Sequence, residues 1–394
     1  MEHQTLPVME GFPKEIIRKI HLRDQKRKAS LPNVLGGQPL QLVLEELLLW
    51  DLSVLTVSFK GGDTSVYRQI ADVAAEWSKY ANISFDFGYN AETERFREWV
   101  PGDTSSIRIG FNDPGYWSFL GTDSLDPEIC RPGDITLNLN GFDINLPRNW
   151  KSTVLHEFGH ALGFHHEHQS PAANCDFDWE RLYAYLAGPP NFWSKEQVDY
   201  NLKQLPAGGL TYSAHDKNSI MHYSFPAWMF LSGTDSVCYV EENTGLSEED
   251  KIMAGRAYPF DDELLEEQRL QRSASLTQLL RFAKAFSEPE HHAYQNRIHM
   301  LRGYAAKHTE YISIDLQVKN AILIAAGQAG EDPRNLAEQI AIGNLLPTDF
   351  AYQFLADLLN EIVKQHNPAA AVRITDVSNA KTVADCIQLI IGKV

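Results

Sequence analysis

The 394-residue sequence holds few cysteines, and they are widely spread. Cys130, Cys175, Cys238 and Cys386 form no CxxC pair, which excludes a small disulfide-rich scaffold. Isolated cysteines in a chain of this length are typical of free thiols in a reducing compartment. We therefore expect free thiols.

Long apolar runs are also missing. The apolar stretch from Leu40 to Val57 is interrupted by Glu45, Glu46 and Asp51, whereas a spanning helix needs about 20 apolar residues. The N-terminus lacks the apolar core of a secretory signal. We therefore expect no membrane span and favour a cytoplasmic location, with export by a non-classical route as the open alternative.

Positive charge is scarce as well. The chain has 35 basic and 52 acidic residues, a formal net charge of −17. A general nucleic-acid binder is usually basic, so this balance argues against nucleic acid as a partner. The hydrophobic fraction of 43% is enough for a sizeable core, and at roughly 150 residues per domain the length suggests two or three domains.

The middle of the chain alternates strand and helix patterns. Val66, Ile70, Val73 and Trp77 follow the spacing of one helix face. Runs rich in β-branched and aromatic residues, or alternating in polarity, predict strands at 52–59, 83–89, 105–111 and 134–140. This order predicts an α+β layer with a mixed sheet over residues 50–262.

The first 49 residues form a predicted N-terminal arm. A basic helical patch from Lys14 to Lys28 is followed by a loop. The interpretation that we favour is a solvated arm. The alternative is a pro-like segment that covers an active site.

The stretch HEFGHALGFHH, residues 156–166, carries the chemistry. His156 and His160 lie four apart and share one face of a predicted helix, so both can point at one ion. Zn²⁺ prefers nitrogen ligands, and a catalytic zinc has three protein ligands with one position open.

The third ligand must come from beyond the helix. Gly163 lets the chain turn sharply, and the pattern H-E-x-x-H-x-x-G-x-x-H then assigns His166 by counting. His165 and His168 are spacers in this register. Glu157 is not expected to bind zinc, because its place beside the first ligand suits a general base for water.

Met221 lies in SIMHYSF (219–225), 55 residues after His166. Together with the zinc motif, with Glu167 directly after the third histidine and with Met-His-Tyr at 221–223, this stretch resembles the astacin-type metzincin zinc proteases. The resemblance covers roughly residues 50–260. It includes DPGYWSFLGTDS (113–124), similar to the segment that follows the family's substrate-pairing edge strand, and a closing helix at 245–259.

The resemblance implies a metzincin catalytic domain: a mixed, mostly parallel twisted sheet with a backing helix and an active-site helix. It implies that Met221 forms an apolar floor beneath the metal, and that Gly163 is the hinge between two subdomains. Tyr223 would be a movable zinc ligand whose hydroxyl helps to hold the oxyanion.

Some family features are absent from the sequence. Tyr116 stands where a half-cystine would precede the tryptophan, and residues 1–49 contain no FxGD motif. In the family the glutamate equivalent to Glu167 contacts the matured N-terminus. Here two alternatives are open for Glu167: pairing with a cation, or bonding to the backbone.

An acidic stretch at 261–268 marks a predicted boundary, after which the pattern is helical. We expect an all-α accessory domain over 263–394 that binds a protein partner or directs targeting. Its end in part resembles acyl carrier proteins, but Asp349 stands near the place of the carrier serine, so phosphopantetheine loading is not expected. His291, His292 and His299 are expected to be solvated.

The sequence thus predicts a zinc-dependent endopeptidase that hydrolyses protein or peptide substrates, with Glu157 as general base. A second hypothesis is a latent or inactive binding protein on a metzincin scaffold, regulated by the helical C-terminal domain. A third is a protease switched by that domain or by the N-terminal arm.

Overall fold

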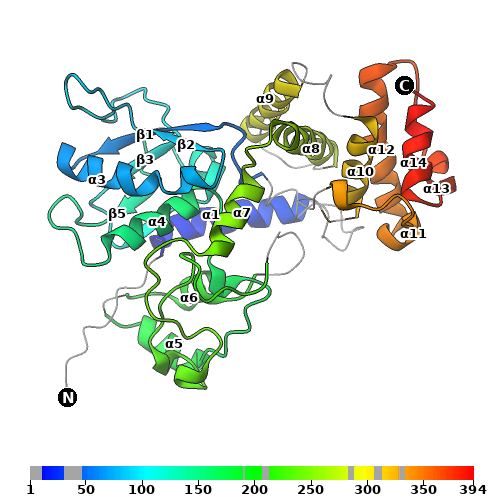
Figure 1. Ribbon diagram of the computed structural model, residues 1–394. Helices are drawn as coiled ribbons and strands as arrows, with labels where there is room; N and C mark the ends of the chain where they lie inside the picture. Colours follow the sequence, from blue (N-terminus) through cyan, green and yellow to red (C-terminus); the bar gives the residue numbers. More distant parts are fainter. Residues whose placement is uncertain are drawn as a thin grey trace. The chain divides into compact units, whose positions relative to one another are not determined.

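The computed structural model describes residues 11–30, 47–189, 191–205, 213–282, 288–305, 313–326, 328 and 333–394. Two compact units are present (Figure 1). The first contains the described residues between 11 and 24 and between 48 and 258. The second contains those between 25 and 47 and from 259 to the end.

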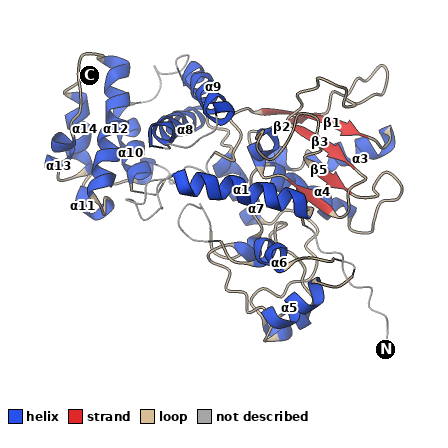
Figure 2. Ribbon diagram, turned by 180° about the vertical axis from the view of Figure 1, so that it is seen from behind, coloured by secondary structure: helices blue, strands red, loops and turns tan. Residues whose placement is uncertain are grey.

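A five-stranded sheet organises the first unit (Figure 2). Its order is β2-β1-β3-β5-β4, and only the β4–β5 pair is antiparallel. The predicted mixed, mostly parallel sheet is therefore confirmed. The strands are β1 (Val54–Lys60), β2 (Ser84–Asp86), β3 (Ile107–Gly110), β4 (Tyr116–Ser118) and β5 (Leu137–Leu139).

Two helices pack with this sheet in one apolar core. Helix α3 (Thr64–Ala74) begins at Asp63, whose side chain accepts the backbone N–H of Ser65 at 2.8 Å. Its buried face includes Val66 and Ile70, as predicted. Helix α4 (Trp150–Ala161) is buried on all sides from Ser152 to Ala161, which places the histidine motif inside the protein.

The rest of the first unit contains short helices and loops. Its α-helices are α5 (Trp179–Leu186), α6 (Lys195–Leu202) and α7 (Glu248–Ala257). Its 3₁₀ helices are η2 (Trp77–Lys79), η3 (Gly121–Leu125), η4 (Glu167–Gln169), η5 (Ala227–Met229) and η6 (Gly233–Asp235).

Cys175 and Cys238 form a disulfide, so the expectation of free thiols is wrong for these two. The two cysteines are 63 residues apart in the sequence, so no local pattern predicts their pairing; only folding brings the two loops together. Cys130 and Cys386 are free and buried, as expected.

The N-terminal arm is not solvated over its described residues in the first unit. In helix α1 (Lys14–Ser30), Ile17 and Ile20 are 2% and 3% exposed. The Arg23 guanidinium is buried and forms ion pairs with Asp123 and Asp126. The favoured interpretation is therefore wrong here, because this segment buries an apolar face and a paired charge.

The second unit is all-helical in its described part, and its largest core cluster joins α10, α12 and α14. Asp349 opens α12. The helices are α8 (Asp262–Phe282), α9 (Glu288–Ala305), α10 (Ile314–Ala325), α11 (Ile342–Leu345), α12 (Asp349–His366), α13 (Ile374–Asn379) and α14 (Val383–Ile391), with the 3₁₀ helix η7 (Pro333–Asn335).

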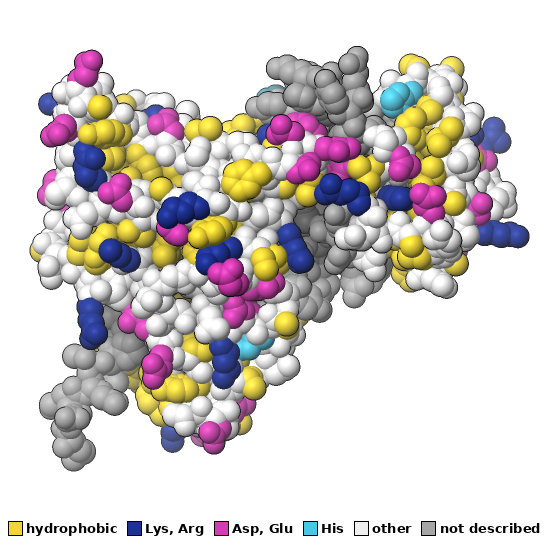
Figure 3. All heavy atoms as spheres, viewed as in Figure 1, with side chains coloured by type: hydrophobic (Ala, Val, Ile, Leu, Met, Phe, Trp, Pro, Cys, Tyr) yellow, Lys and Arg dark blue, Asp and Glu magenta, His cyan; other side chains and the backbone are white. Residues whose placement is uncertain are grey.

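The surface is mixed in character. On the face shown in Figure 3, acidic and basic side chains are interspersed with apolar ones on both units. Among the described helices, none combines the length and the apolar composition that crossing a bilayer requires.

Candidate metal centre

The three predicted ligand histidines meet in the structure. Helix α4 presents His156 and His160 on one face, and their Nε2 atoms are 3.0 Å apart. The Nε2 of His166, beyond the helix, is 2.9 Å from that of His160. In a tetrahedral zinc site with Zn–N of about 2.0–2.1 Å, ligand nitrogens are roughly 3.3–3.4 Å apart. The triad thus needs only a small expansion to hold an ion.

In both helix histidines the other ring nitrogen, Nδ1, makes a hydrogen bond that fixes the ring. The Nδ1 of His156 lies 2.7 Å from the Ile220 carbonyl, and that of His160 lies 2.7 Å from the Phe164 carbonyl. A carbonyl oxygen only accepts, so each Nδ1 carries the proton, and in the neutral ring Nε2 exposes its lone pair. Such orientation of ligands by outer hydrogen bonds is typical of metal sites.

His166 follows the same rule through a side chain. Its Nδ1 lies 3.1 Å from the Gln169 Oε1. Burial, together with the neighbouring histidines His160, His168 and His156, lowers the pKa of His166 well below its usual value. The Nε2 atoms of the three rings therefore converge, an arrangement that a bound cation would stabilise. The donor set fits zinc.

The turn to the third histidine depends on Gly163. Its φ of +97° is a backbone conformation that favours glycine, and its N–H donates to the His160 carbonyl at 2.8 Å. The indole of Trp50 donates to the Ala161 carbonyl at 2.7 Å, and the hydroxyl of Tyr258 donates to that of Leu162 at 2.5 Å. The end of α4 is thus fixed, and the chain can double back.

Met221 lies against α4 at Gly159. A Cβ added at Gly159 would overlap the Met221 sulfur, so the helix and the methionine are in close contact. The backbone N–H of Glu167 donates to the Met221 carbonyl at 2.9 Å, which joins this turn to the segment after the third ligand. Met221 is therefore packed against the helix that carries His156 and His160.

Glu157 and Tyr223 are both close to the histidines. Glu157 follows His156 on α4 and is fully buried. The Tyr223 ring centroid is 4.3 Å from that of His166 and 5.6 Å from that of His156. His168, predicted as a spacer, stacks on Tyr223 with centroids 5.0 Å apart. His168 therefore packs against the tyrosine ring.

Glu167 bonds to the backbone, one of the two alternatives left open. Its Oε1 accepts the backbone N–H of Asp216 at 2.9 Å, and burial raises the pKa of Glu167 to about 7. The buried carboxylate of Asp250 in α7 accepts the Ser219 hydroxyl at 2.7 Å and the Ile220 N–H at 2.8 Å. Both carboxylates hold the segment that carries Met221.

The sequence interpretation missed two parts of this region. Gln169 was not assigned a role, although it lies three residues after His166, in HEHQSP (166–171), and its Oε1 is hydrogen-bonded to His166. A second histidine pair, His215 and His222, has its Nε2 atoms 3.0 Å apart. Its seven-residue spacing has no characteristic motif.

A buried helix with two histidines, a glycine turn to a third, and a methionine beneath them define a metzincin-type site. No family model matches the sequence. Zinc metalloproteinase nas-2 of Caenorhabditis elegans is 31% identical over 140 residues, 34% of this chain and 42% of that protein. Protein SpAN of Strongylocentrotus purpuratus is 24% identical over 241 residues, 58% of this chain and 34% of its own. The chain thus spans less than half the length of these curated relatives.

A solved structure of myroilysin is 38% identical, covering 55% of this chain and 97% of the other, with a TM-score of 0.46. The hatching enzyme HCE-1, a zinc-protease of the medaka Oryzias latipes, is 18% identical and covers 53% and 94% of the two chains, with a TM-score of 0.35. The 38% identity that covers 97% of the myroilysin chain, rather than these superpositions, supports the assignment. The chain belongs to the astacin-like metzincins, as its motifs predicted.

Proposed function

We propose that the protein is a zinc-dependent endopeptidase. This proposal rests on the convergence of three histidine nitrogens: the Nε2 of His160 lies 3.0 Å from that of His156 and 2.9 Å from that of His166. The Nδ1 of each ring is hydrogen-bonded, and the neighbouring Glu157 is buried. A relative named as a zinc metalloproteinase supports the metal and the reaction class. His156, His160 and His166 would hold the ion.

The chain's own residues supply the remaining chemistry. Zinc, when bound, acts as a Lewis acid and lowers the pKa of water to about 7. Glu157 would accept the proton of the attacking water and pass it to the leaving amine. The hydroxyl of Tyr223, beside His166, would donate a hydrogen bond to the developing oxyanion.

Casein cleavage with and without a chelator tests the reaction class. We expect hydrolysis to stop when zinc is removed and to return when zinc is added. Cleavage that continues without metal would exclude this mechanism. A full-length protein that binds zinc but cleaves neither casein nor a peptide library would favour the inactive binding protein.

The N-terminal arm supports a latent state of the same enzyme. The backbone N–H of Gly11 donates to the Tyr116 carbonyl at 3.3 Å, on β4. The Phe12 ring packs on Trp117 and Phe119, with centroids 5.6 Å and 5.4 Å apart. An extended peptide pairs with a free sheet edge in this way, so we infer that the arm occupies part of the substrate edge.

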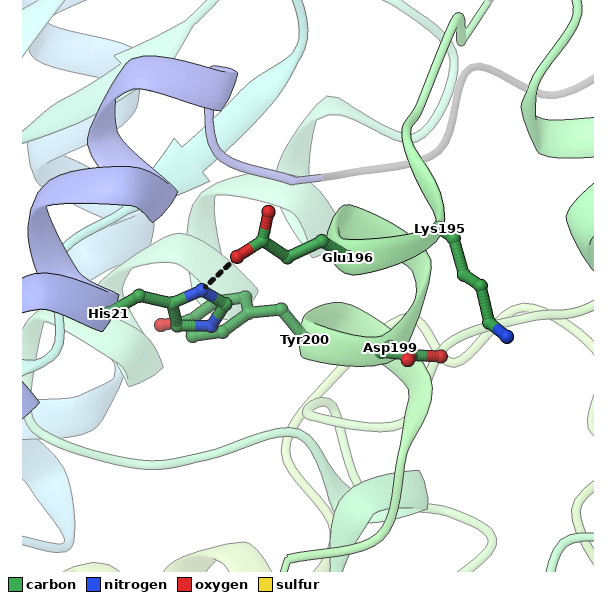
Figure 4. Close-up of a pocket in the computed structure, with 5 residues that line it drawn as sticks. All are labelled: His21, Lys195, Glu196, Asp199 and Tyr200. Atoms are coloured by element: carbon green, nitrogen blue, oxygen red, sulfur yellow. Dashed lines mark hydrogen bonds and ion pairs between the residues drawn. The ribbon is translucent and has the colours of Figure 1, made fainter. Parts of the chain in front are cut away.

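A second contact joins the arm to α6. Figure 4 shows the His21 ring of α1 pointing at Glu196, with its Nδ1 2.9 Å from the carboxylate. The ring of Tyr200 meets His21 edge-on at 5.2 Å. The arm therefore contacts both β4 and α6, and we infer that it must move before a long substrate can bind.

The helical second unit and the compartment also stand as proposals. We propose that residues 263–394 bind a protein partner, and a comparison of the full chain with one ending near residue 262 tests whether they regulate cleavage.

The Cys175–Cys238 disulfide favours oxidising surroundings for the first unit. This points away from a permanently reducing cytoplasm.

A further inference from the structure

A second cluster of metal-binding side chains lies in the first unit, apart from the histidine triad. Ligand atoms of His215, His222 and Cys238 lie within 4.8 Å of one another. His222 and Cys238 are buried and His215 is half-buried. In tetrahedral zinc geometry two nitrogens are about 3.3 Å apart, and a nitrogen and a sulfur about 3.6 Å. The two histidine nitrogens, 3.0 Å apart, are close to this spacing, and the sulfur lies within 4.8 Å of both.

The histidine pair is already oriented as a ligand pair. The Nδ1 of His222 donates to the Tyr223 carbonyl at 2.8 Å, so the neutral ring presents the lone pair of Nε2. That atom is 3.0 Å from the Nε2 of His215. Two imidazoles alone make a weak site, and a third ligand of higher charge is needed.

Cys238 can supply that ligand only in one redox state. While its sulfur is bonded to Cys175 it carries no thiolate charge. Two thiol molecules can reduce the bond: the S–S bond breaks, each cysteine gains a proton, and the two thiols are oxidised to a disulfide of their own. A metal ion then displaces the proton from the Cys238 thiol.

The cysteine segments are also joined by hydrogen bonds that do not involve the disulfide. The Asp176 carboxylate, one residue from Cys175, accepts the Ser232 N–H at 2.8 Å and its hydroxyl at 2.6 Å. The Ser236 hydroxyl also bonds to Asp176, and it accepts the Cys238 N–H at 3.2 Å. These bonds hold the Cys238 loop independently of its sulfur.

The histidine segment is tied to the same loop. The Lys217 ammonium donates to the Ser236 carbonyl at 3.3 Å. The Asn243 amide donates to the carbonyls of Lys217 and Ser219, at 2.9 Å and 2.8 Å. The two halves of the cluster therefore remain together after reduction.

We propose that reduction of the Cys175–Cys238 disulfide creates a second zinc site, formed by the Nε2 atoms of His215 and His222 and the Cys238 thiolate. Imidazole and thiolate together suit zinc, a borderline-soft ion. The half-buried His215 marks the open side, where water completes the coordination. The site would bind zinc only when the disulfide is reduced, so zinc binding there would respond to the redox state of the surroundings. It lies at the turn that carries Tyr223.

Two cysteine variants of the full chain separate this site from the loss of the disulfide. Both lose the disulfide, but Cys175→Ser keeps the Cys238 thiol whereas Cys238→Ser removes it. After dialysis against zinc, metal analysis should find one additional zinc per chain in Cys175→Ser and none in Cys238→Ser. Adding His222→Ala to Cys175→Ser should abolish the gain. Equal zinc contents in the two cysteine variants overturn the proposal.

The wild-type chain provides a second measurement that does not depend on variant folding. Metal-free protein is reduced with a dithiol, freed of the reductant without oxygen, and titrated with Co²⁺. Reduced protein should show a thiolate-to-cobalt charge-transfer band that oxidised protein lacks. Absence of the band overturns the proposal. The triad offers only nitrogen ligands, so it does not give this band. Metal analysis of His160→Ala measures the metal content of the triad separately. A negative result at one site therefore leaves the other site untouched.

Discussion

Gly159 of α4 lies directly against the sulfur of Met221, with no room for a side chain between them. The helix that carries His156 and His160 therefore rests on the turn that carries Tyr223. The same turn accepts the Nδ1 proton of His156 at the Ile220 carbonyl. The Gly159–Met221 contact and the His156–Ile220 hydrogen bond thus both join α4 to this turn.

Gly159→Ala should destabilise the protein by about 1–3 kcal/mol, because overpacking forces the methionine or the helix to move. Urea unfolding measures this change, and metal analysis reports any displacement of the ligands. Gly245→Ala is the matched control, since a Cβ there meets nothing within 4 Å. An alanine at position 159 that is neutral or stabilising would contradict the close contact.

Glu157→Gln should keep zinc and lose casein hydrolysis by roughly 10²–10⁴-fold, because the amide cannot accept the proton of water. Metal analysis and initial rates on the same sample test both statements. His160→Ala is the contrasting variant, because it removes a ligand and should lower bound zinc. Wild-type rates in Glu157→Gln would exclude the general-base role.

Tyr223→Phe should lower kcat on the order of 10²–10³-fold with little change in KM, because only the oxyanion loses a donor. Tyr183→Phe serves as control, since that hydroxyl bonds to Asp199 at 2.5 Å rather than lying beside the triad. Peptide kinetics distinguish the two outcomes. An unchanged kcat in Tyr223→Phe would show that the tyrosine only packs against the histidines.

Arg23→Ala should release the N-terminal arm and raise the rate of casein cleavage. Breaking a buried ion pair costs about 3–5 kcal/mol, because Asp123 and Asp126 lose their partner. Limited proteolysis should then cut near residue 23 more readily. Arg18→Ala removes an exposed pair with Glu15 and should leave both readouts unchanged. Released but equally active protein would refute inhibition by the arm.

Asp86 should stabilise the fold only above acidic pH. The hydrogen bond from Arg97 at 2.7 Å lowers the pKa of Asp86 below its ordinary value. The stabilisation is therefore complete above the unfolded pKa of about 4 and is lost as the pH falls through the folded pKa. Half-exposure limits it to below about 1 kcal/mol. The unfolding free energies of wild type and Asp86→Asn should converge at low pH; a constant gap contradicts this.

Much of the site could be predicted because its information is local. The pair His156 and His160 follows from helix geometry, and Gly163 with His166 follows within six residues. The strands were harder to predict where they are short: β4 has three residues, and the sheet around it, rather than its own pattern, makes Tyr116–Ser118 a strand. The burial of Ile17 and Ile20 likewise depends on the surface that receives α1.

The sequence by itself determined the candidate zinc ligands, the candidate base and the family. These residues lie close together in the chain, so one helix and one turn are enough to bring their side chains together. Only the tertiary structure decided that Cys175 joins Cys238, that His215 faces His222, and that the arm lies along β4. These contacts join segments distant in the chain. Their pairing is set by packing of the whole unit, which no local pattern encodes.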